Sequence, residues 1–170
     1  MLGALALALS DRQRAAVTEG SGVAESDAVA LSVLEHIFES PRVDELARVL
    51  GLTSSGAVRL LDRLEDAGLA RRVPAEDRRV TATALTAAGR RRAQAVTRAR
   101  QELMEGALEA LTPAERSQFG ELAGKILAGL VRPPGATRWT CRLCDLVACG
   151  RPQGRCPVYE AANARYAPGG

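Results

Sequence analysis

Residues 43–68 read VDELARVLGLTSSGAVRLLDRLEDAG, and this stretch decides the fold. Apolar residues at helical spacing predict a short helix over 43–50, and Gly51 ends it because glycine readily terminates a helix. A longer helix is predicted over 53–67, and it ends at Gly68. Two helices joined by a tight glycine turn are typical of a helix-turn-helix.

The second of these helices has two chemically different faces. Its apolar stripe, which can pack on a core, consists of Ala57, Leu60, Leu61, Leu64 and Ala67. The opposite face carries Ser54, Ser55, Arg59, Asp62 and Arg63. Hydroxyls and backbone N–H groups near a helix start suit phosphates, arginine can grip a guanine edge, and Thr53 or Ser54 suits the N-cap. An ordinary solvated helix carries the same residue types, so the prediction depends on the whole arrangement.

A basic hairpin is predicted directly after this helix. Residues 69–74 and 80–85 alternate weakly in polarity and flank the charged segment 75–79. The element contains four arginines, which are Arg71, Arg72, Arg78 and Arg79. An exposed basic hairpin beside a recognition helix suits a phosphate backbone or a narrow minor groove.

A family resemblance follows from these motifs. Asp77-Arg78-Arg79, followed by Leu85-Thr86 and Gly89, resembles the wing pattern of the MarR family of bacterial transcriptional regulators, and residues 26–131 are similar to that family as a whole. The resemblance implies an obligate homodimer on a pseudo-palindromic operator. It also implies that the recognition helices enter successive major grooves, with Arg79 and Arg78 at the minor groove.

The flanking sequence predicts further helices. These are expected over residues 1–18, 25–40 and 87–111, with another that begins at Pro113 behind a capping box at 112–115. The apolar start, residues 1–9, has no positive n-region and is too short to cross a membrane. Two apolar-striped helices outside a small DNA-binding domain need a partner, and a second subunit supplies one.

The expected fold class is mainly α with a small β wing. A winged helix-turn-helix DNA-binding domain over 25–86 is joined to a helical dimerisation domain. The dimerisation helices occupy 1–24 and 87–132, and a tail occupies 133–170. The net charge of +3 is modest, so the attraction for DNA must come from the local concentration of arginines.

Nothing in the sequence indicates an enzyme. His36 is the only histidine and lies on a core helix, where a hydrogen-bonding role is more common than chemistry. No Ser-His-Asp or Cys-His set can be built without it, and no glycine-rich phosphate loop follows a strand. We therefore assign no catalytic residue.

The tail departs from the usual family pattern, which normally ends with the last dimerisation helix, and it contains every cysteine in the chain. Cys141, Cys144, Cys149 and Cys156 fall within a short segment that includes Trp139. A Cys-x2-Cys pair can present two thiolates to one metal, and the glycines and prolines between the later cysteines let the chain turn back to complete a four-sulfur site. The neighbouring arginines 142, 151 and 155 can offset part of the negative charge.

Two metals fit such a site. Zinc held by four thiolates would be structural and would stabilise a tail too short to fold alone. The alternative is an iron–sulfur cluster, which also takes four thiolates and would make the protein a redox sensor. Disulfides fit poorly, because an intracellular DNA-binding protein lives in a reducing compartment.

The sequence therefore predicts a cytoplasmic, homodimeric DNA-binding regulator, a repressor in our interpretation, controlled by metal or redox state at the cysteine site. The partners expected are double-stranded DNA, a second copy and an unidentified small-molecule effector, with no membrane. The alternative is a metal-centred protein-interaction module that uses its winged helix without binding DNA. A thiol oxidoreductase would need a βαβ context around the cysteine pair, and the sequence does not predict one.

Overall fold

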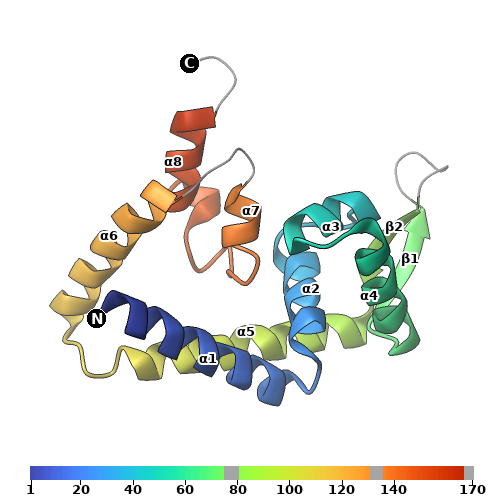
Figure 1. The fold of residues 1–170 in the computed structure, drawn as a ribbon, viewed down its shortest axis with the longest axis horizontal. Coiled ribbons are helices and arrows are strands. Elements are labelled where there is room, and N and C mark those ends of the chain that lie inside the picture. The colour runs from blue at the N-terminus through green and yellow to red at the C-terminus, as the bar shows by residue number, and fades with distance from the viewer. Residues whose placement is uncertain (75–80, 131–135, 167–170) are drawn as a thin grey trace.

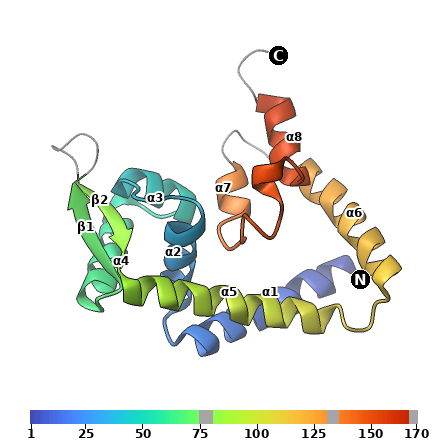
Figure 2. The same cartoon turned by 180° about the vertical axis from the view of Figure 1, so that it is seen from behind.

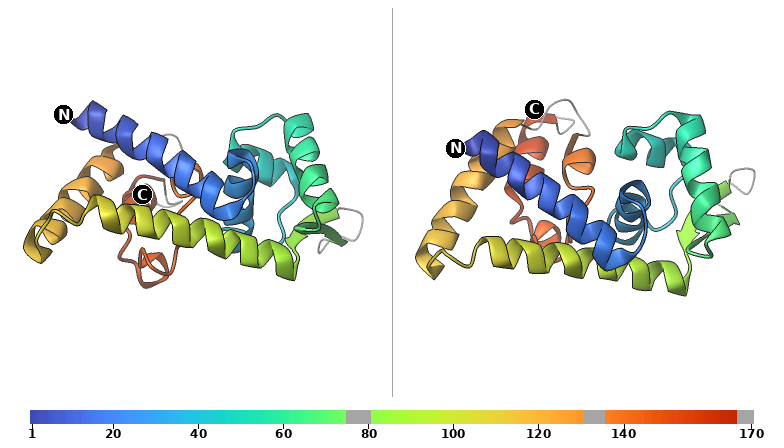
Figure 3. Two further views of the ribbon diagram at one scale, coloured as in Figure 1. Left: turned by 90° about the horizontal axis from the view of Figure 1, so that it is seen from below. Right: turned by 60° about the horizontal axis from the view of Figure 1, so that its bottom comes forward.

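Helix α5 (Ala87–Ala107) is the axis along which the other elements are arranged. The computed structural model describes residues 1–74, 81–130 and 136–166. Figure 1 shows a winged-helix lobe at one end of α5 and helix α6 (Pro113–Leu130) rising from the other end. Helix α1 (Leu2–Ser21) packs on α5 and approaches it most closely near the lobe (Figure 3). A Cβ added at Gly20 would lie 2.7 Å from the Ala99 Cβ, so the two helices are tightly packed at that point.

The lobe contains the predicted helix-turn-helix and wing. Its helices are α2 (Glu25–His36), α3 (Val43–Leu50) and α4 (Ser54–Asp66). Strands β1 (Ala70–Pro74) and β2 (Thr81–Leu85) pair antiparallel, with Ala70 opposite Leu85 and Pro74 opposite Thr81. The predicted fold class, mainly α with a small β wing, is confirmed.

Apolar burial holds the lobe together. Leu31 from α2, Leu46 from α3 and Leu64 from α4 are almost completely buried in one cluster. Burying one such side chain stabilises the fold by about 1.5–3 kcal/mol. The stripe predicted on α4 is confirmed at Ala57, Leu60, Leu61 and Leu64. It is wrong at Ala67, which is exposed because the helix ends at Asp66 and Ala67 is its C-cap.

The motif that joins the wing to α5 has a clear structural basis. The Thr86 hydroxyl accepts a hydrogen bond from the Gly89 N–H at 3.0 Å, which caps α5, and donates to the Gly68 carbonyl at 2.7 Å. A Cβ at Gly89 would lie only 1.9 Å from the Leu69 carbonyl oxygen, so only glycine fits here. These contacts fix the wing and the end of α4 against the start of α5.

Several helix ends differ from the sequence-based bounds. Helix α1 continues to Ser21, because Gly22 adopts the left-handed conformation that terminates it. Helix α2 stops at His36 instead of residue 40, because the chain must turn to bring the Pro41 carbonyl within 3.1 Å of the Thr83 N–H. Helix α5 stops at Ala107 instead of residue 111.

His36 and the capping box behave as the sequence indicates. The His36 Nε2 lies 3.0 Å from the Thr97 hydroxyl and links α2 to α5. The Glu115 carboxylate accepts from the Thr112 N–H at 2.8 Å at the start of α6. None of the described helices has the length and apolar character needed to cross a membrane.

The tail folds into short elements that lie between the lobe and α6 (Figure 2). These are α7 (Ala136–Thr140), the 3-10 turn η1 (Arg151–Gln153) and α8 (Pro157–Tyr166). Helix α8 packs on α6, where a Cβ at Gly124 would lie 2.9 Å from Pro157 Cγ. The tail is therefore docked on a helix that the sequence assigns to dimerisation.

Candidate nucleic-acid interface and cysteine site

The N-terminus of α4 presents short hydroxyl side chains to solvent. Thr53 is the N-cap, and its hydroxyl accepts from the Gly56 N–H at 3.1 Å. Ser54 and Ser55 are exposed in the first turn. A helix N-terminus with free N–H groups and hydroxyls favours phosphate oxygens, so this end of α4 suits a nucleic-acid backbone.

The two arginines predicted on α4 differ in their surroundings. Arg59 is exposed and has no ion-pair partner among the described residues. Arg63 lies 2.7 Å from the Asp27 carboxylate and is thereby drawn toward α2. Asp27 keeps only 15% of its side chain exposed, so this ion pair supports the packing of the lobe. Arg59 is therefore the freer of the two for a DNA contact.

The two arginines in the described part of the wing also differ in their surroundings. Arg71 is exposed. Arg72 forms ion pairs with Asp62 and, at 3.3 Å, with Glu65, which attach β1 to α4. Arg78 and Arg79, predicted at the minor groove, lie outside the described residues, as does Asp77 of the wing motif.

The four cysteines of the tail come together as free thiols. Cys141, Cys144, Cys149 and Cys156 belong to one small cluster that also contains Val158. The Cys141 thiol donates to Cys144, which lowers the pKa of Cys144 and raises that of Cys141. Burial raises the pKa of Cys149, with smaller contributions from Cys156 and Cys144. Each thiol is therefore within interaction range of another member of the set.

The thiols do not form a finished coordination shell. Within residues 1–74, 81–130 and 136–166, no three His, Cys, Asp or Glu side chains are arranged so that they could hold a metal ion. Thiols that hydrogen-bond to one another retain a proton, whereas metal ligands are thiolates drawn to a common centre. A metal would need the four sulfur atoms to close further.

One cation beside the thiols was not predicted from the sequence. Cys141 contributes most to lowering the pKa of Cys144, and the positive charges of Arg100 on α5 and of Arg151 lower it further. Arg151 is one of the three arginines that the sequence places near the cysteines. Arg142 instead stacks on Trp139, with its guanidinium carbon 3.9 Å from the ring centre. The sequence did not indicate Arg100, because this residue lies far from the cysteines in the chain and belongs to no recognisable motif.

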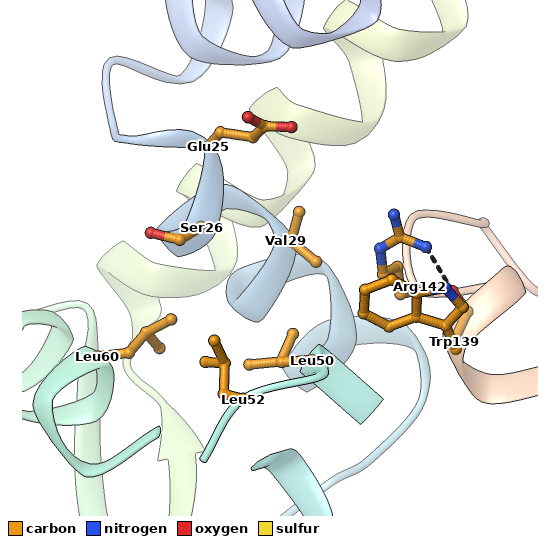
Figure 4. Close-up of a pocket in the computed structure, with 8 residues that line it drawn as sticks. All are labelled: Glu25, Ser26, Val29, Leu50, Leu52, Leu60, Trp139 and Arg142. Carbon is orange, nitrogen blue, oxygen red and sulfur yellow. Dashed lines mark hydrogen bonds between the residues drawn. The ribbon is translucent and has the colours of Figure 1, made fainter. Parts of the chain in front are cut away.

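A pocket of about 220 Å³ separates the tail from the lobe. It is lined by Glu25, Ser26, Val29, Leu50, Leu52, Leu60, Trp139 and Arg142. Figure 4 shows Trp139 and Arg142 entering it from the tail, opposite Val29 and Leu50. A Cβ at Gly51 would lie 3.0 Å from Cζ3 of Trp139, so the indole rests against the turn between α3 and α4.

Comparisons with known proteins agree with this geometry. A family model described as MarR family matches residues 21–80, which include the helix-turn-helix and the first strand of the wing. The cysteine tail lies outside that match. A comparison with curated protein sequences gives no match.

Solved structures extend the similarity to most of the chain. A MarR family protein from Bacillus stearothermophilus is 28% identical with a TM-score of 0.68, covering 77% of this chain and 91% of its own. The YusO protein from Bacillus subtilis is 29% identical with a TM-score of 0.63, covering 76% and 91%. MarR from Escherichia coli, at 23% identity and a TM-score of 0.61 over 75% and 97%, shares the fold. Residues 21–80 therefore match the MarR family, and most of the chain shares the fold of solved MarR family structures.

Proposed function

We propose that the protein is a DNA-binding transcriptional regulator that acts in the cytoplasm as a homodimer on a pseudo-palindromic operator. The observation that carries this proposal is the polar face of α4. Ser54, Ser55 and Arg59 are exposed on this face, while the opposite stripe of the same helix is buried in the lobe. A helix anchored along one side and polar along the other can enter a major groove without disturbing the core.

Each group has a distinct part in the complex. The start of α4, with Ser54 and Ser55, meets backbone phosphates, and Arg59 reaches a base edge or a phosphate in the major groove. Arg78 and Arg79 of the wing reach the minor groove of the flanking DNA. Arg63 joins this surface only if DNA competes with Asp27 for its guanidinium. A dimer bound over a promoter excludes polymerase, which is the basis for proposing a repressor.

A homodimer would cover the apolar surface at the end of the molecule opposite the lobe. Leu2 and Leu7 of α1 are 66% and 68% exposed, and Leu130 of α6 is 70% exposed. The start of α1 lies at the same end of the molecule as α6 (Figures 1 and 2). Apolar surface of this extent favours a partner, and a second copy offers the same surface. We expect Ile126→Glu to yield monomers in sedimentation velocity and Gln118→Glu, on the same helix, to leave the dimer intact.

We further infer that the cysteine tail controls the regulator by holding a metal. Four thiols in one cluster have the donor chemistry that zinc or an iron–sulfur cluster takes, although the sulfur atoms must move closer together to bind either one, and the charges of Arg100 and Arg151 favour the thiolate form of Cys144. Metal analysis with a visible spectrum on protein purified without oxygen distinguishes the two. Zinc without colour indicates a structural centre, iron with sulfide indicates a sensor, and the absence of both metals would overturn the inference.

Salt-dependent binding tests the DNA proposal. We expect wild-type protein to bind a duplex from its own upstream region, with an affinity that falls steeply as salt rises. Arg79→Ala should weaken binding and lessen the salt slope without lowering thermal stability. Arg98→Ala removes the same charge from the exposed side of α5 and is the matched control. If wild-type protein shows neither salt dependence nor sequence preference, the protein-interaction alternative replaces this proposal.

A further inference from the structure

The tail is anchored on the helices of the proposed dimerisation domain. The Arg100 guanidinium on α5 donates to the Leu143 carbonyl at 2.6 Å, and its Nε donates to the Gln13 side chain of α1 at 3.3 Å. The Leu143 side chain packs on Val17 and Val96. At the other end of the tail, Pro157 lies against Gly124 of α6. One side of the tail is therefore held against helices α1, α5 and α6.

The opposite side of the tail contacts the helix-turn-helix itself. Trp139 rests on Gly51, whose φ of +64° forms the turn between α3 and α4. The left-handed backbone favours glycine there, and a Cβ would crowd the indole at 3.0 Å. Beside it, the Arg138 guanidinium carbon lies 4.9 Å from the Phe38 ring centre. The tail thus bridges the dimerisation helices and the turn that positions the recognition helix.

The path from the thiols to Trp139 is short. The Trp139 carbonyl accepts from the Arg142 N–H at 3.3 Å, and the Cys141 carbonyl accepts from the Cys144 N–H at 2.8 Å. Trp139 and the Cys141–Cys144 pair are therefore parts of one hydrogen-bonded segment of backbone. A change in the spacing of the thiols would therefore act directly on this segment, which Arg100 holds at the Leu143 carbonyl.

We propose that Trp139 transmits the state of the four-cysteine centre to the recognition helix through its contact with Gly51. This deepens the proposed control by the tail and rests on it. With the centre intact, the indole holds α3 and α4 at one angle to α5. When the centre is dismantled, the indole leaves the turn and the angle is released. Because the two recognition helices of a dimer must match the spacing of their half-sites, a change in this angle changes operator affinity.

The chain offers a direct probe, because Trp139 is its only tryptophan. Full-length protein purified without oxygen is compared before and after treatment with a chelator and a thiol oxidant. We expect the tryptophan emission to shift on treatment, and also when operator DNA is added to the untreated protein. Operator affinity should change by ~5–150-fold between the two states, the usual size of coupling between sites.

Variants of Trp139 separate the contact from the centre. Trp139→Ala should retain its metal and thiols but bind operator with nearly the same affinity in both states, and Trp139→Phe should recover part of the difference. Val147→Ala alters an exposed residue of the same tail, 72% accessible, and should behave as wild type.

The outcomes distinguish the two proposals. If wild-type affinity does not respond to treatment, control by the tail fails and this inference fails with it. If wild type responds and Trp139→Ala responds equally, control stands and the route through Trp139 is overturned. An emission spectrum that is unchanged by treatment also overturns the route, and this measurement needs no variant.

Discussion

The winged-helix lobe and the cysteine tail of this chain are stabilised by different means. The lobe buries leucines from α2, α3 and α4 in a common core, with Leu31, Leu46 and Leu64 almost inaccessible to solvent. In the tail, the buried cluster consists of Cys141, Cys156 and Val158. So small an apolar cluster offsets little of the entropy lost when a segment is ordered. The lobe therefore has an apolar core of its own, whereas the tail has only a small buried cluster and rests on the helices beneath it.

Because the tail has so small an apolar cluster, we expect the largest effect of any substitution at its cysteines. Cys141→Ser should abolish metal binding and expose the tail to proteolysis while leaving the melting of the lobe unchanged. Structural zinc sites contribute about 10–16 kcal/mol of apparent binding free energy, and this would be lost with the ligand. Metal content and limited proteolysis followed by mass spectrometry measure both effects.

Ala148→Ser is the matched control for that change, because it introduces the same hydroxyl at an exposed position between two cysteines. A tail that stays resistant to protease after Cys141→Ser would show that the lobe and the tail are not stabilised differently.

The next largest effect is expected in the core of the lobe. Leu64→Ala removes buried methyl groups from α4 and should destabilise the protein by about 2–5 kcal/mol in urea unfolding. Val58→Ala, on the exposed side of the same helix, should cost less than about 1 kcal/mol. Equal losses for the two variants would mean that α4 is not anchored by its buried stripe.

The two arginines of α4 should affect different properties of the protein, which are DNA binding for Arg59 and stability for Arg63. Arg59→Ala should weaken operator binding by about 1–3 kcal/mol without changing stability, because Arg59 has no described ion-pair partner. Arg63→Ala breaks the pair with Asp27 and should lower stability by about 0.2–1 kcal/mol. Anisotropy titrations and thermal melts separate the effects. A stability loss for Arg59→Ala greater than that for Arg63→Ala would reverse these assignments.

The smallest effect is expected at the N-cap of the recognition helix. Thr53→Ala removes the acceptor for the Gly56 N–H and should cost about 1 kcal/mol, whereas Thr53→Ser keeps the hydroxyl and should restore most of it. Chemical denaturation compares the two. If alanine and serine behave alike, the cap contributes nothing.

The sequence predicted the lobe well because its signals are local. The helical spacing of Leu60, Leu61 and Leu64 and the cap at Thr53 act within one or two turns of the same helix. The errors occurred where tertiary contacts override the local pattern. The apolar pattern continued past His36, but α2 ends there so that Pro41 can reach β2.

The tail shows the limit of sequence reasoning. The spacing of its cysteines predicted a common site, and the structure brings the four thiols into one cluster. No spacing could indicate that Arg100 lies beside Cys144 or that Trp139 rests on Gly51, because these pairs are far apart in the chain. The DNA contacts of Arg78 and Arg79 remain predictions.

A footprint on the DNA upstream of the protein's own reading frame tests the central claim most directly. Two recognition helices related by a two-fold axis should protect two half-sites about one helical turn apart, roughly 10 base pairs between their centres, on a pseudo-palindromic sequence. Arg59→Ala should lose this protection at a protein concentration at which Arg98→Ala retains it. Uniform protection without a symmetric pattern, or no protection at low salt, would contradict the account of a dimeric operator-binding regulator.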